Sequence, residues 1–320
     1  MGIFHCPVGA VCYKGFGCIE CGMCIAATKE DIVKATEIIR RYVQANGSRR
    51  AKSIEKIAVC GKGGSGKSTI SAMVASSFAR MGYLPLVLDT DDSNAGLAKK
   101  LGISEPPLPL IRCLERFSIG ENAPPKDWLI KDPLRISEIP PEFIVQRAGI
   151  SLMLSGKIEN PLQGCSCNIS DLTKQLVQNL ELDKREKLIV DHDAGIESFG
   201  RGEEQGVDTV IIVVEPSFDS IDLAEKIKYL SEGLGIRRIR ALINKAADAD
   251  EIALVREMLS EREIRYLGAL TADRNLAACN LRGQEILATQ LQSAVDKIMM
   301  LMLDEAEMGY KKPSTEKGGM

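Results

Sequence analysis

The stretch GKGGSGKST at positions 61–69 constrains this chain of 320 residues more than any other feature. It follows the apolar run KIAVC, which is typical of a buried strand, and it opens a helical pattern that reads KSTISAMVASSFARMG. The pattern G-x-x-x-x-G-K-[ST] between a strand and a helix predicts a loop that wraps the phosphates of a nucleotide. Glycines let backbone N–H groups turn toward phosphate oxygens, and the helix N-terminus adds partial positive charge.

The residues of this loop have distinct predicted roles. Lys67 reaches the β- and γ-phosphates, and the hydroxyl of Ser68 binds Mg²⁺. The other residues expected around the phosphates are Gly61, Gly63, Gly64, Ser65, Gly66 and Thr69. A later strand, KLIVDHD, ends with Asp191, where a carboxylate would hold the Mg²⁺ through water.

Apolar runs alternate with helical patterns along the rest of the chain. These runs span 56–60, 84–90, 150–154, 187–193, 209–216 and 239–245. Runs rich in Val, Ile and Leu, separated by helices, indicate a mainly parallel sheet that is covered on both faces. We therefore predict a doubly wound α/β P-loop NTPase domain with a small cysteine-rich module before it. The expected divisions are the cysteine-rich module at 1–45, a linker at 46–53, the P-loop domain at 54–305 and a tail at 306–320.

Two segments within the domain have less regular patterns. Residues 280–306 read as one long C-terminal helix. The Pro-rich segment 103–147, which holds the single tryptophan, reads as an insertion of loops and short helices.

Composition limits the partners and the compartment. The net charge of −3 gives no global field that favours nucleic acid or an anionic membrane. No apolar run approaches the roughly 18 residues of a spanning helix, and the first residues lack the pattern of a secretory signal. We expect a cytoplasmic protein with no nucleic-acid partner and no membrane partner.

Ten cysteines against two histidines suggest metal or redox chemistry. In a reducing compartment, clustered cysteines more often bind metal or do redox chemistry than form structural disulfides. Cys60, Cys113 and Cys279 stand alone in the sequence, and we expect each to be a small buried apolar residue.

One cysteine cluster is the pair in GCSC, residues 164–167, which is expected on a loop between a strand and a helix. Cys165 and Cys167 at i and i+2 can point two sulfurs the same way. Soft divalent metals and iron–sulfur clusters take about four ligands, so two thiolates form half a site. A second copy of the chain across a two-fold axis could supply the other half, with Ni²⁺, Zn²⁺ or a shared cluster between them. A redox-active disulfide within the pair is the alternative.

The other cluster is CIECGMC at 18–24, which has the C-x-x-C-x-x-C spacing of a bacterial ferredoxin loop. Cys18, Cys21 and Cys24 are predicted to hold a [4Fe–4S] cluster. The fourth ligand is Cys12 or Cys6, and Cys12 is counted among the predicted ligands. Zinc is the main rival, because C-x-x-C pairs also hold zinc.

The loop at 61–69 carries a second lysine, and this K-G-G-x-G-K pattern resembles the deviant Walker A family of nitrogenase iron protein and the septum-site ATPase MinD. The resemblance implies that Lys62 reaches the partner's nucleotide across a dimer interface. It also implies that Asp91 orients the attacking water and that Asn244 reads the adenine edge. The stretch NKAAD carries Asp248 one residue later than the GTPase pattern NKxD requires, which favours ATP over GTP.

The stretch DHDAGIESFGRG at 191–202 points to a narrower group within this family. It is similar to D-x-E-A-G-I-E-H-x-x-R-G of the CooC-type ATPases, which insert nickel into carbon monoxide dehydrogenase. The chain departs from that pattern at Asp193 and Ser198. The segments SGKIENPLQGCSC, LDTDDSNAGLAKKLG and VVEPSFDSI also fit, and the resemblance covers about residues 54–300. It implies that Glu215 and Pro216, in the last segment, contribute to the nucleotide site.

Two functions remain open from the sequence. One is a dimeric metallochaperone ATPase that loads a carbon monoxide dehydrogenase-like client, and the C-x-C motif and the 191–202 stretch favour it. The other is an ATP-gated iron–sulfur electron donor for a metalloenzyme or corrinoid protein, which the N-terminal cysteines favour. Both assign ATP, Mg²⁺ and a homodimer to the chain.

Overall fold

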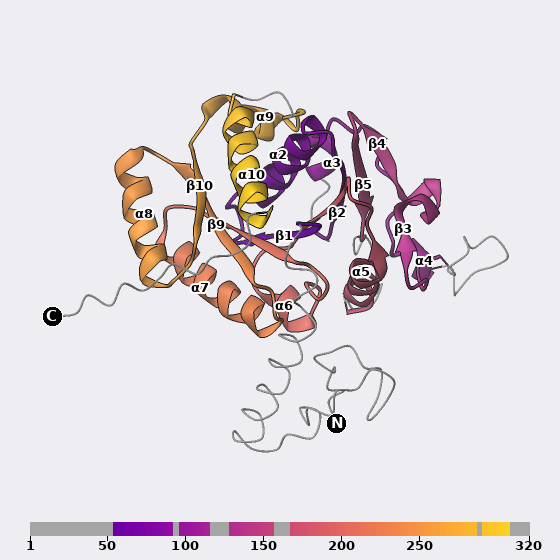
Figure 1. Cartoon of the computed structure of the whole chain (residues 1–320). Coiled ribbons are helices and arrows are strands. Elements are labelled where there is room, and N and C mark those ends of the chain that lie inside the picture. Colours follow the sequence, from indigo (N-terminus) through magenta and orange to yellow (C-terminus); the bar gives the residue numbers. More distant parts are fainter. Residues whose placement is uncertain (1–53, 92–95, 116–127, 157–166, 287–289, 308–320) are drawn as a thin grey trace, which may run out of the picture.

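The computed structural model describes residues 54–91, 96–115, 128–156, 167–286 and 290–307 (Figure 1). The predicted cysteine-rich module, the linker and most of the predicted tail lie outside these residues. The predicted P-loop domain therefore accounts for nearly everything described below.

A single large sheet organises the described residues, with strand order β10-β9-β8-β1-β7-β2-β5-β4. The strands are β1 (Lys56–Gly61), β2 (Leu84–Asp89), β4 (Val145–Arg147), β5 (Ile150–Leu154), β7 (Glu186–Asp191), β8 (Thr209–Val214), β9 (Arg238–Ala246) and β10 (Tyr266–Thr271). All neighbouring strands pair in parallel except β4, which pairs antiparallel with β5 at one edge. This sheet confirms the prediction of a mainly parallel α/β domain.

Helices cover both faces of the sheet (Figure 1). One face carries α2 (Lys67–Arg80), α3 (Gly96–Lys100) and α10 (Gln292–Glu307), with α9 (Arg274–Arg282) beside them. The other face carries α5 (Cys167–Asn179), α6 (Glu197–Arg201), α7 (Phe218–Gly233) and α8 (Ala249–Glu261). This double covering explains why the central strands are apolar at nearly every position.

Strand β1 shows how the sheet separates the two cores. Ile57 and Val59 pack in the cluster under α2, whereas Ala58 and Cys60 pack in the cluster under α7. All four side chains are at most 1% exposed. Successive residues of a strand point to opposite faces, so the two sides of β1 contact different helices.

Helix α10 is fixed to α2 by a polar cluster around Asp296. Its carboxylate accepts hydrogen bonds from Ser77, Gln292 and Arg80. Burial alone would raise the pKa of Asp296, but these hydrogen bonds and the Arg80 charge together lower it. The C-terminal helix is thereby held against the helix that follows the phosphate loop.

The insertion predicted at 103–147 contains more strand than expected. Besides α4 (Arg112–Glu115) and the short helices Ile136–Glu138 and Pro141–Phe143, it provides the edge strand β4. It also provides β3 (Leu134–Arg135), which pairs in parallel with β6 (Leu180–Glu181) in a separate two-stranded sheet. Trp128 packs against Phe143 with ring centroids 5.5 Å apart, and both belong to the same apolar cluster as Cys60 and Val190, so this segment extends the core of the sheet.

The prediction of one helix over 280–306 is wrong. Helix α9 ends at Arg282, because Gly283 adopts the left-handed conformation (φ +62°) that closes helix C-termini. The next described helix, α10, begins at Gln292. Among the described residues, no helix combines the length and the apolar character needed to cross a membrane.

Candidate functional site

The phosphate loop lies between β1 and α2, at the carboxyl edge of the sheet. Gly61 has φ +145°, and a Cβ atom there would lie closer than 3.0 Å to the carbonyl of Val213. Gly66 caps α2 in a left-handed conformation, and its carbonyl accepts the first helical bond, from Ile70 N. This arrangement leaves the first N–H groups of a 14-residue helix facing the loop, as an anion site requires.

Both lysines of the loop contact nearby groups of their own chain. Lys67 Nζ donates to the carbonyl of Lys62 at 3.4 Å. Lys62 Nζ lies 3.3 Å from Glu215 Oε1 and 3.9 Å from Asp219 Oδ2. The structure therefore brings the predicted site residues Lys62, Lys67 and Glu215 together, with Lys62 paired to Glu215 before α7 and to Asp219 in its first turn.

Two residues at the end of β9 fasten the loop from the far side. Asn244 Nδ2 donates to the carbonyl of Ser65 at 2.8 Å, and Asn244 is only 6% exposed. Lys245 donates to the carbonyl of Gly64 and lies 3.9 Å from Glu215. Asn244 is thus part of the loop's support, and its adenine contact stays a prediction. The sequence did not predict a role for Lys245, because no local pattern indicates a contact with Gly64, 181 residues earlier.

Asp191 ends β7 and points toward α2, next to the loop. Its Oδ1 accepts a hydrogen bond from Ser71 at 2.8 Å, and its buried Oδ2 has no partner among the described residues. Burial raises the pKa of Asp191 to about 6, although the nearby hydroxyls of Ser68 and Ser71 and the charge of Lys67 oppose that shift. An unpartnered carboxylate oxygen beside the Ser68 hydroxyl fits a Mg²⁺ site, since Mg²⁺ takes oxygen ligands. Ser71, on the first turns of α2, is a further site residue that the motif did not reveal.

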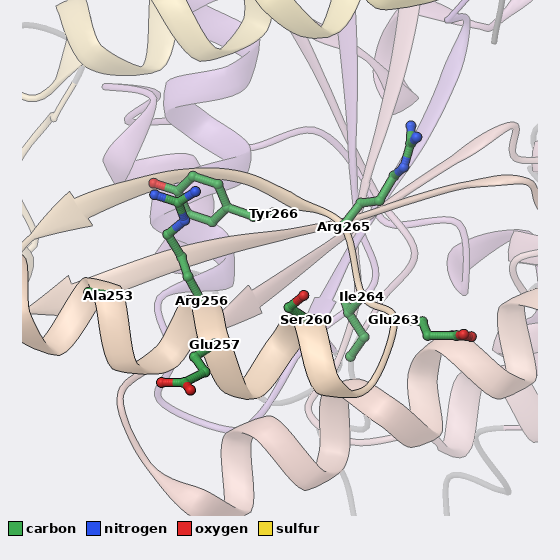
Figure 2. Close-up of a pocket in the computed structure, with 8 residues that line it drawn as sticks. All are labelled: Ala253, Arg256, Glu257, Ser260, Glu263, Ile264, Arg265 and Tyr266. Carbon is green, nitrogen blue, oxygen red and sulfur yellow. The ribbon is translucent and has the colours of Figure 1, made fainter. Parts of the chain in front are cut away.

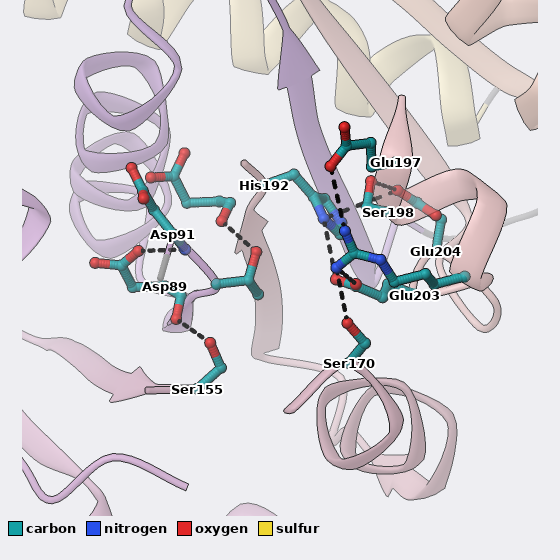
Figure 3. Close-up of polar contacts among 12 residues, drawn as sticks. Asp89, Asp91, Ser155, Ser170, His192, Glu197, Ser198, Glu203 and Glu204 are labelled. Carbon is teal, nitrogen blue, oxygen red and sulfur yellow. Dashed lines mark hydrogen bonds and ion pairs between the residues drawn. The ribbon is translucent and has the colours of Figure 1, made fainter. Parts of the chain in front are cut away.

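Asp89 ends β2 and pairs with Asp191 of β7, and Asp91 follows two residues later (Figure 3). Asp91 N donates to Asp89 Oδ1 at 3.1 Å, and the Asp89 carbonyl accepts from Ser155 Oγ at 3.1 Å. Thr90 Oγ1 donates to the carbonyl of Asp191 at 2.9 Å. Asp91 is therefore near the predicted Mg²⁺ ligand, and its role in orienting water remains a prediction.

Helix α6, which follows Asp191 along the chain, is joined to α5 by hydrogen bonding to Ser170 (Figure 3). Arg201, on α6, donates from Nη1 to Ser170 Oγ at 3.0 Å and from Nη2 to Glu197 Oε2 at 3.3 Å. Ser170 lies on the first turn of α5, which begins at Cys167. The guanidinium therefore joins the turn that starts at Cys167 to the segment that follows Asp191, the predicted Mg²⁺ ligand.

Most of the predicted metal-ligating cysteines lie outside the described residues. Cys165 and the N-terminal cysteines Cys12, Cys18, Cys21 and Cys24 lie outside the described residues, and so does the side chain of Cys167. The expectation that the whole motif lies on a loop needs correction, because Cys167 is the first residue of α5. Cys60 and Cys113 are buried, as expected for isolated cysteines, whereas Cys279 is partly exposed.

A pocket elsewhere on the domain does not belong to this site. It lies between α8 and the start of β10, where Arg256 stacks over Tyr266 at 4.6 Å from the ring centroid (Figure 2). The amino ends of parallel strands lie at the edge of the sheet opposite the phosphate loop. This pocket is therefore remote from the nucleotide.

The phosphate loop, the carboxylate of Asp191 at the end of β7 and the doubly wound sheet together define a P-loop NTPase. Residues 56–286 match the family described as CbiA, the CobQ/CobB/MinD/ParA nucleotide binding domain, and the chain belongs to that family. Members bind and hydrolyse ATP, so the predicted ATPase class is confirmed.

Sequence comparison adds closer relatives. An uncharacterized ATP-binding protein of Methanocaldococcus jannaschii, MJ0084, is 33% identical over 77% of this chain and 99% of its own length. The carbon monoxide dehydrogenase accessory protein CooC of Rhodospirillum rubrum is 32% identical over 71% of this chain and 88% of its own length. The chain thus resembles this accessory protein over nearly all of the latter's length.

Structural comparison supports the fold. The MinD cell division protein of Aquifex aeolicus superposes with a TM-score of 0.56 at 19% identity, covering 81% of this chain and all of that chain. MinD of Pyrococcus furiosus superposes with a TM-score of 0.58 at 17% identity, covering 78% of this chain and 98% of that chain. At such identities the likeness concerns the fold alone.

Proposed function

We propose that this chain is an ATP-hydrolysing, dimeric maturation factor that loads metal into a carbon monoxide dehydrogenase-like enzyme. The observation that carries the proposal is the similarity to CooC over 88% of that protein, combined with the paired thiols Cys165 and Cys167. Two thiolates per chain are half of a four-ligand site, so the metal binds between two copies. The metal at this pair, nickel or another soft divalent ion, is cargo.

The chain's own residues would hold ATP and Mg²⁺ at the loop. Lys67 and the first N–H groups of α2 bind the phosphates, while Ser68 and the unpartnered oxygen of Asp191 face the ion. When bound, Mg²⁺ neutralises charge that develops on the phosphates during hydrolysis. Asp91, two residues beyond the end of β2, is positioned to orient the attacking water.

Closure of the dimer requires Lys62 to exchange partners. In the single chain it pairs with Glu215 and Asp219 at 3.3 and 3.9 Å, and its side chain is 36% exposed. Exposed ion pairs of this kind contribute about 0–1 kcal/mol, so breaking them costs little. A phosphate of the partner's ATP, with more charge than either carboxylate, would then attract Lys62 across the interface.

Arg201 transmits the structural change caused by ATP binding to the pair Cys165 and Cys167. Its two hydrogen bonds join Ser170, on the turn that follows Cys167, to Glu197 in the segment after Asp191. Movement of that segment on ATP binding would therefore shift the start of α5. In this way ATP and metal act on one interface, and each raises the affinity for the other.

A second function is favoured by one specific feature, the C-x-x-C-x-x-C spacing at 18–24. A [4Fe–4S] cluster held by Cys18, Cys21 and Cys24, with Cys12, would suit an ATP-gated electron donor for a metalloenzyme or corrinoid protein. Anaerobic purification with iron, sulfide and zinc analysis separates the possibilities. Iron and sulfide that depend on these cysteines support a cluster, whereas zinc alone contradicts it.

The proposed function is tested by analytical ultracentrifugation with and without Ni²⁺ and a non-hydrolysable ATP analogue. We expect Ni²⁺ to promote the dimer, and the analogue to raise the Ni²⁺ affinity by several-fold to about a hundred-fold. The variant Cys165→Ser/Cys167→Ser should lose the metal-linked dimer and keep ATP binding, while Cys279→Ser serves as the matched thiol control. One Ni²⁺ per chain, with no change in mass and no dependence on nucleotide, would overturn the proposal.

A further inference from the structure

A second group of potential metal ligands lies behind the phosphate loop. Cys60, His192 and Glu204 each offer a ligand atom, and these atoms all lie within 4.8 Å of one another. All three residues are at most 2% exposed. The group is separate from Cys165 and Cys167.

The fold itself creates this group. Val59 and Asp191 are paired across β1 and β7, so the residues that follow them, Cys60 and His192, end up side by side. Because side chains alternate along a strand, Asp191 points toward α2, whereas Cys60 and His192 face the core on the other side. Glu204 reaches the same place from the turn after α6.

The polar atoms in this group lack ordinary partners. Neither ring nitrogen of His192 makes a hydrogen bond within the described part of the chain, and the same holds for Glu204 Oε2. The nearest carboxylate oxygens to His192 Nδ1 belong to Glu203 and Glu204, at 3.9 and 3.8 Å, which is too long for a hydrogen bond. Buried polar groups are nearly always paired, so an unpaired ring nitrogen of His192 and the unpaired Glu204 Oε2, close to the Cys60 thiol, indicate a missing ligand.

A divalent transition metal ion is the ligand that fits this chemistry. Sulfur, imidazole nitrogen and carboxylate oxygen together suit Zn²⁺ and its neighbours Co²⁺ and Ni²⁺. Ligand atoms around a tetrahedral zinc ion lie about 3.3–3.6 Å apart, given bonds of about 2.0–2.3 Å, so the group has to contract by at most about 1.2–1.5 Å from its 4.8 Å limit. Ser198 donates a hydrogen bond to Glu204 Oε1 and so orients the carboxylate from behind.

We infer that Cys60, His192 and Glu204 bind one divalent metal ion of the zinc class, with the fourth coordination position open. The entering ion replaces the thiol proton of Cys60 and the carboxyl proton of Glu204, and both protons leave to solvent. The buried site thus stays electrically neutral, which avoids the cost of burying net charge. Since Cys60 precedes Gly61 and His192 follows Asp191, the ion would tie the phosphate loop to the Mg²⁺-binding strand.

The inference is tested with Co²⁺ on the full chain, in a background that lacks the other clustered thiols. In that background the cysteines at positions 6, 12, 18, 21, 24, 165 and 167 are replaced by serine, which leaves Cys60, Cys113 and Cys279. We expect one Co²⁺ per chain, with the absorbance of a single thiolate–cobalt charge transfer. Adding Cys60→Ser should remove this absorbance and weaken Co²⁺ binding by more than about 100-fold, whereas adding Cys113→Ser, also buried, should change neither. Absence of Co²⁺ binding, or binding that survives Cys60→Ser, overturns the inference.

A second measurement uses the unsubstituted chain and does not depend on whether the variants fold. Crystals grown with Zn²⁺ are measured at the zinc absorption edge. An anomalous peak within bonding distance of Cys60 Sγ and His192 supports the site, and a map with no peak there contradicts it. Because the test uses neither Cys165 nor Cys167, its failure leaves the proposed maturation function standing.

Discussion

Replacement of Gly66 by alanine tests how the phosphate loop is held in shape. Gly66 has φ +101°, and a Cβ atom there would lie under 3.0 Å from Asn244 Nδ2. The left-handed conformation costs a non-glycine residue about 1–2 kcal/mol. The new methyl group would also push the Asn244 amide away from the carbonyl of Ser65, and the loss of that buried hydrogen bond costs about 1–3 kcal/mol. We therefore expect Gly66→Ala to lower the free energy of unfolding by about 2–5 kcal/mol.

Gly64→Ala provides the matched control. Gly64 is also left-handed, with φ +79°, but a Cβ atom there meets nothing within 4 Å. This variant should therefore show the conformational strain alone, about 1–2 kcal/mol. Urea unfolding without nucleotide measures both variants, because neither value then includes a change in ATP binding.

A double-mutant cycle with Asn244→Ala completes the test. Removing Asn244 removes the collision, so the double variant Gly66→Ala/Asn244→Ala should be less destabilised than the sum of the single variants by about 1–3 kcal/mol. If the two substitutions are additive, or if Gly66→Ala costs no more than Gly64→Ala, Asn244 does not restrain the loop and the reasoning fails.

Three further predictions concern catalysis, coupling and pH. In a phosphate-release assay, Lys67→Ala should abolish ATP turnover, and Asp91→Asn should slow turnover while preserving ATP binding. Lys99→Ala, at an exposed position, should act like wild type. A fully active Lys67→Ala variant would contradict the assignment of the phosphate-binding loop. Arg201→Lys keeps the charge but loses the planar guanidinium fork that bonds Ser170 and Glu197 together. In Ni²⁺ titrations, the increase in Ni²⁺ affinity caused by the ATP analogue should therefore largely disappear. An unchanged increase would exclude coupling through Arg201. Because the pKa of Asp296 is lowered, its contribution is present above the ordinary carboxyl pKa and lost as pH falls through the folded-state value. Asp296→Asn should therefore be less stable than wild type at pH 7. Urea unfolding should show that this difference in the free energy of unfolding vanishes in acid. A difference that persists at pH 2 would contradict the lowered pKa of Asp296.

The sequence predicted those parts of the fold that local patterns specify. The phosphate loop and the apolar runs that became β1, β2, β5, β7, β8 and β9 could be found because each carries its signal within a few residues. Strand β10 was missed because Gly268 interrupts the apolar run in YLGALT, and β4 because an edge strand of three residues has no distinctive pattern. The break at Gly283 was overlooked because a glycine inside a helical pattern is often tolerated.

The site residues that belong to one local motif were predicted from the sequence. Those that depend on contacts between distant segments were missed. Lys245 supports Gly64, and Ser71 supports Asp191, only after the sheet has formed. Cys60 looked like an isolated apolar residue because His192, 132 residues later, becomes its neighbour only through the pairing of β1 with β7. Such contacts leave no mark in the spacing of residues along a single sequence.

The register of β7 also limits where crossovers can be placed in chimaeric proteins made from this domain and its relatives. Asp191 and His192 face opposite sides of the sheet because they are consecutive, and the register with β1 fixes which side each one faces. A single inserted or deleted residue between Glu186 and His192 would turn the carboxylate toward α6 and the imidazole toward the nucleotide. In chimaeras built from two such ATPases, we expect crossovers inside this strand to survive only when both parents have equal length there. Crossovers in the turn at 182–185 should tolerate unequal lengths, since that turn can absorb an extra residue without moving the strand.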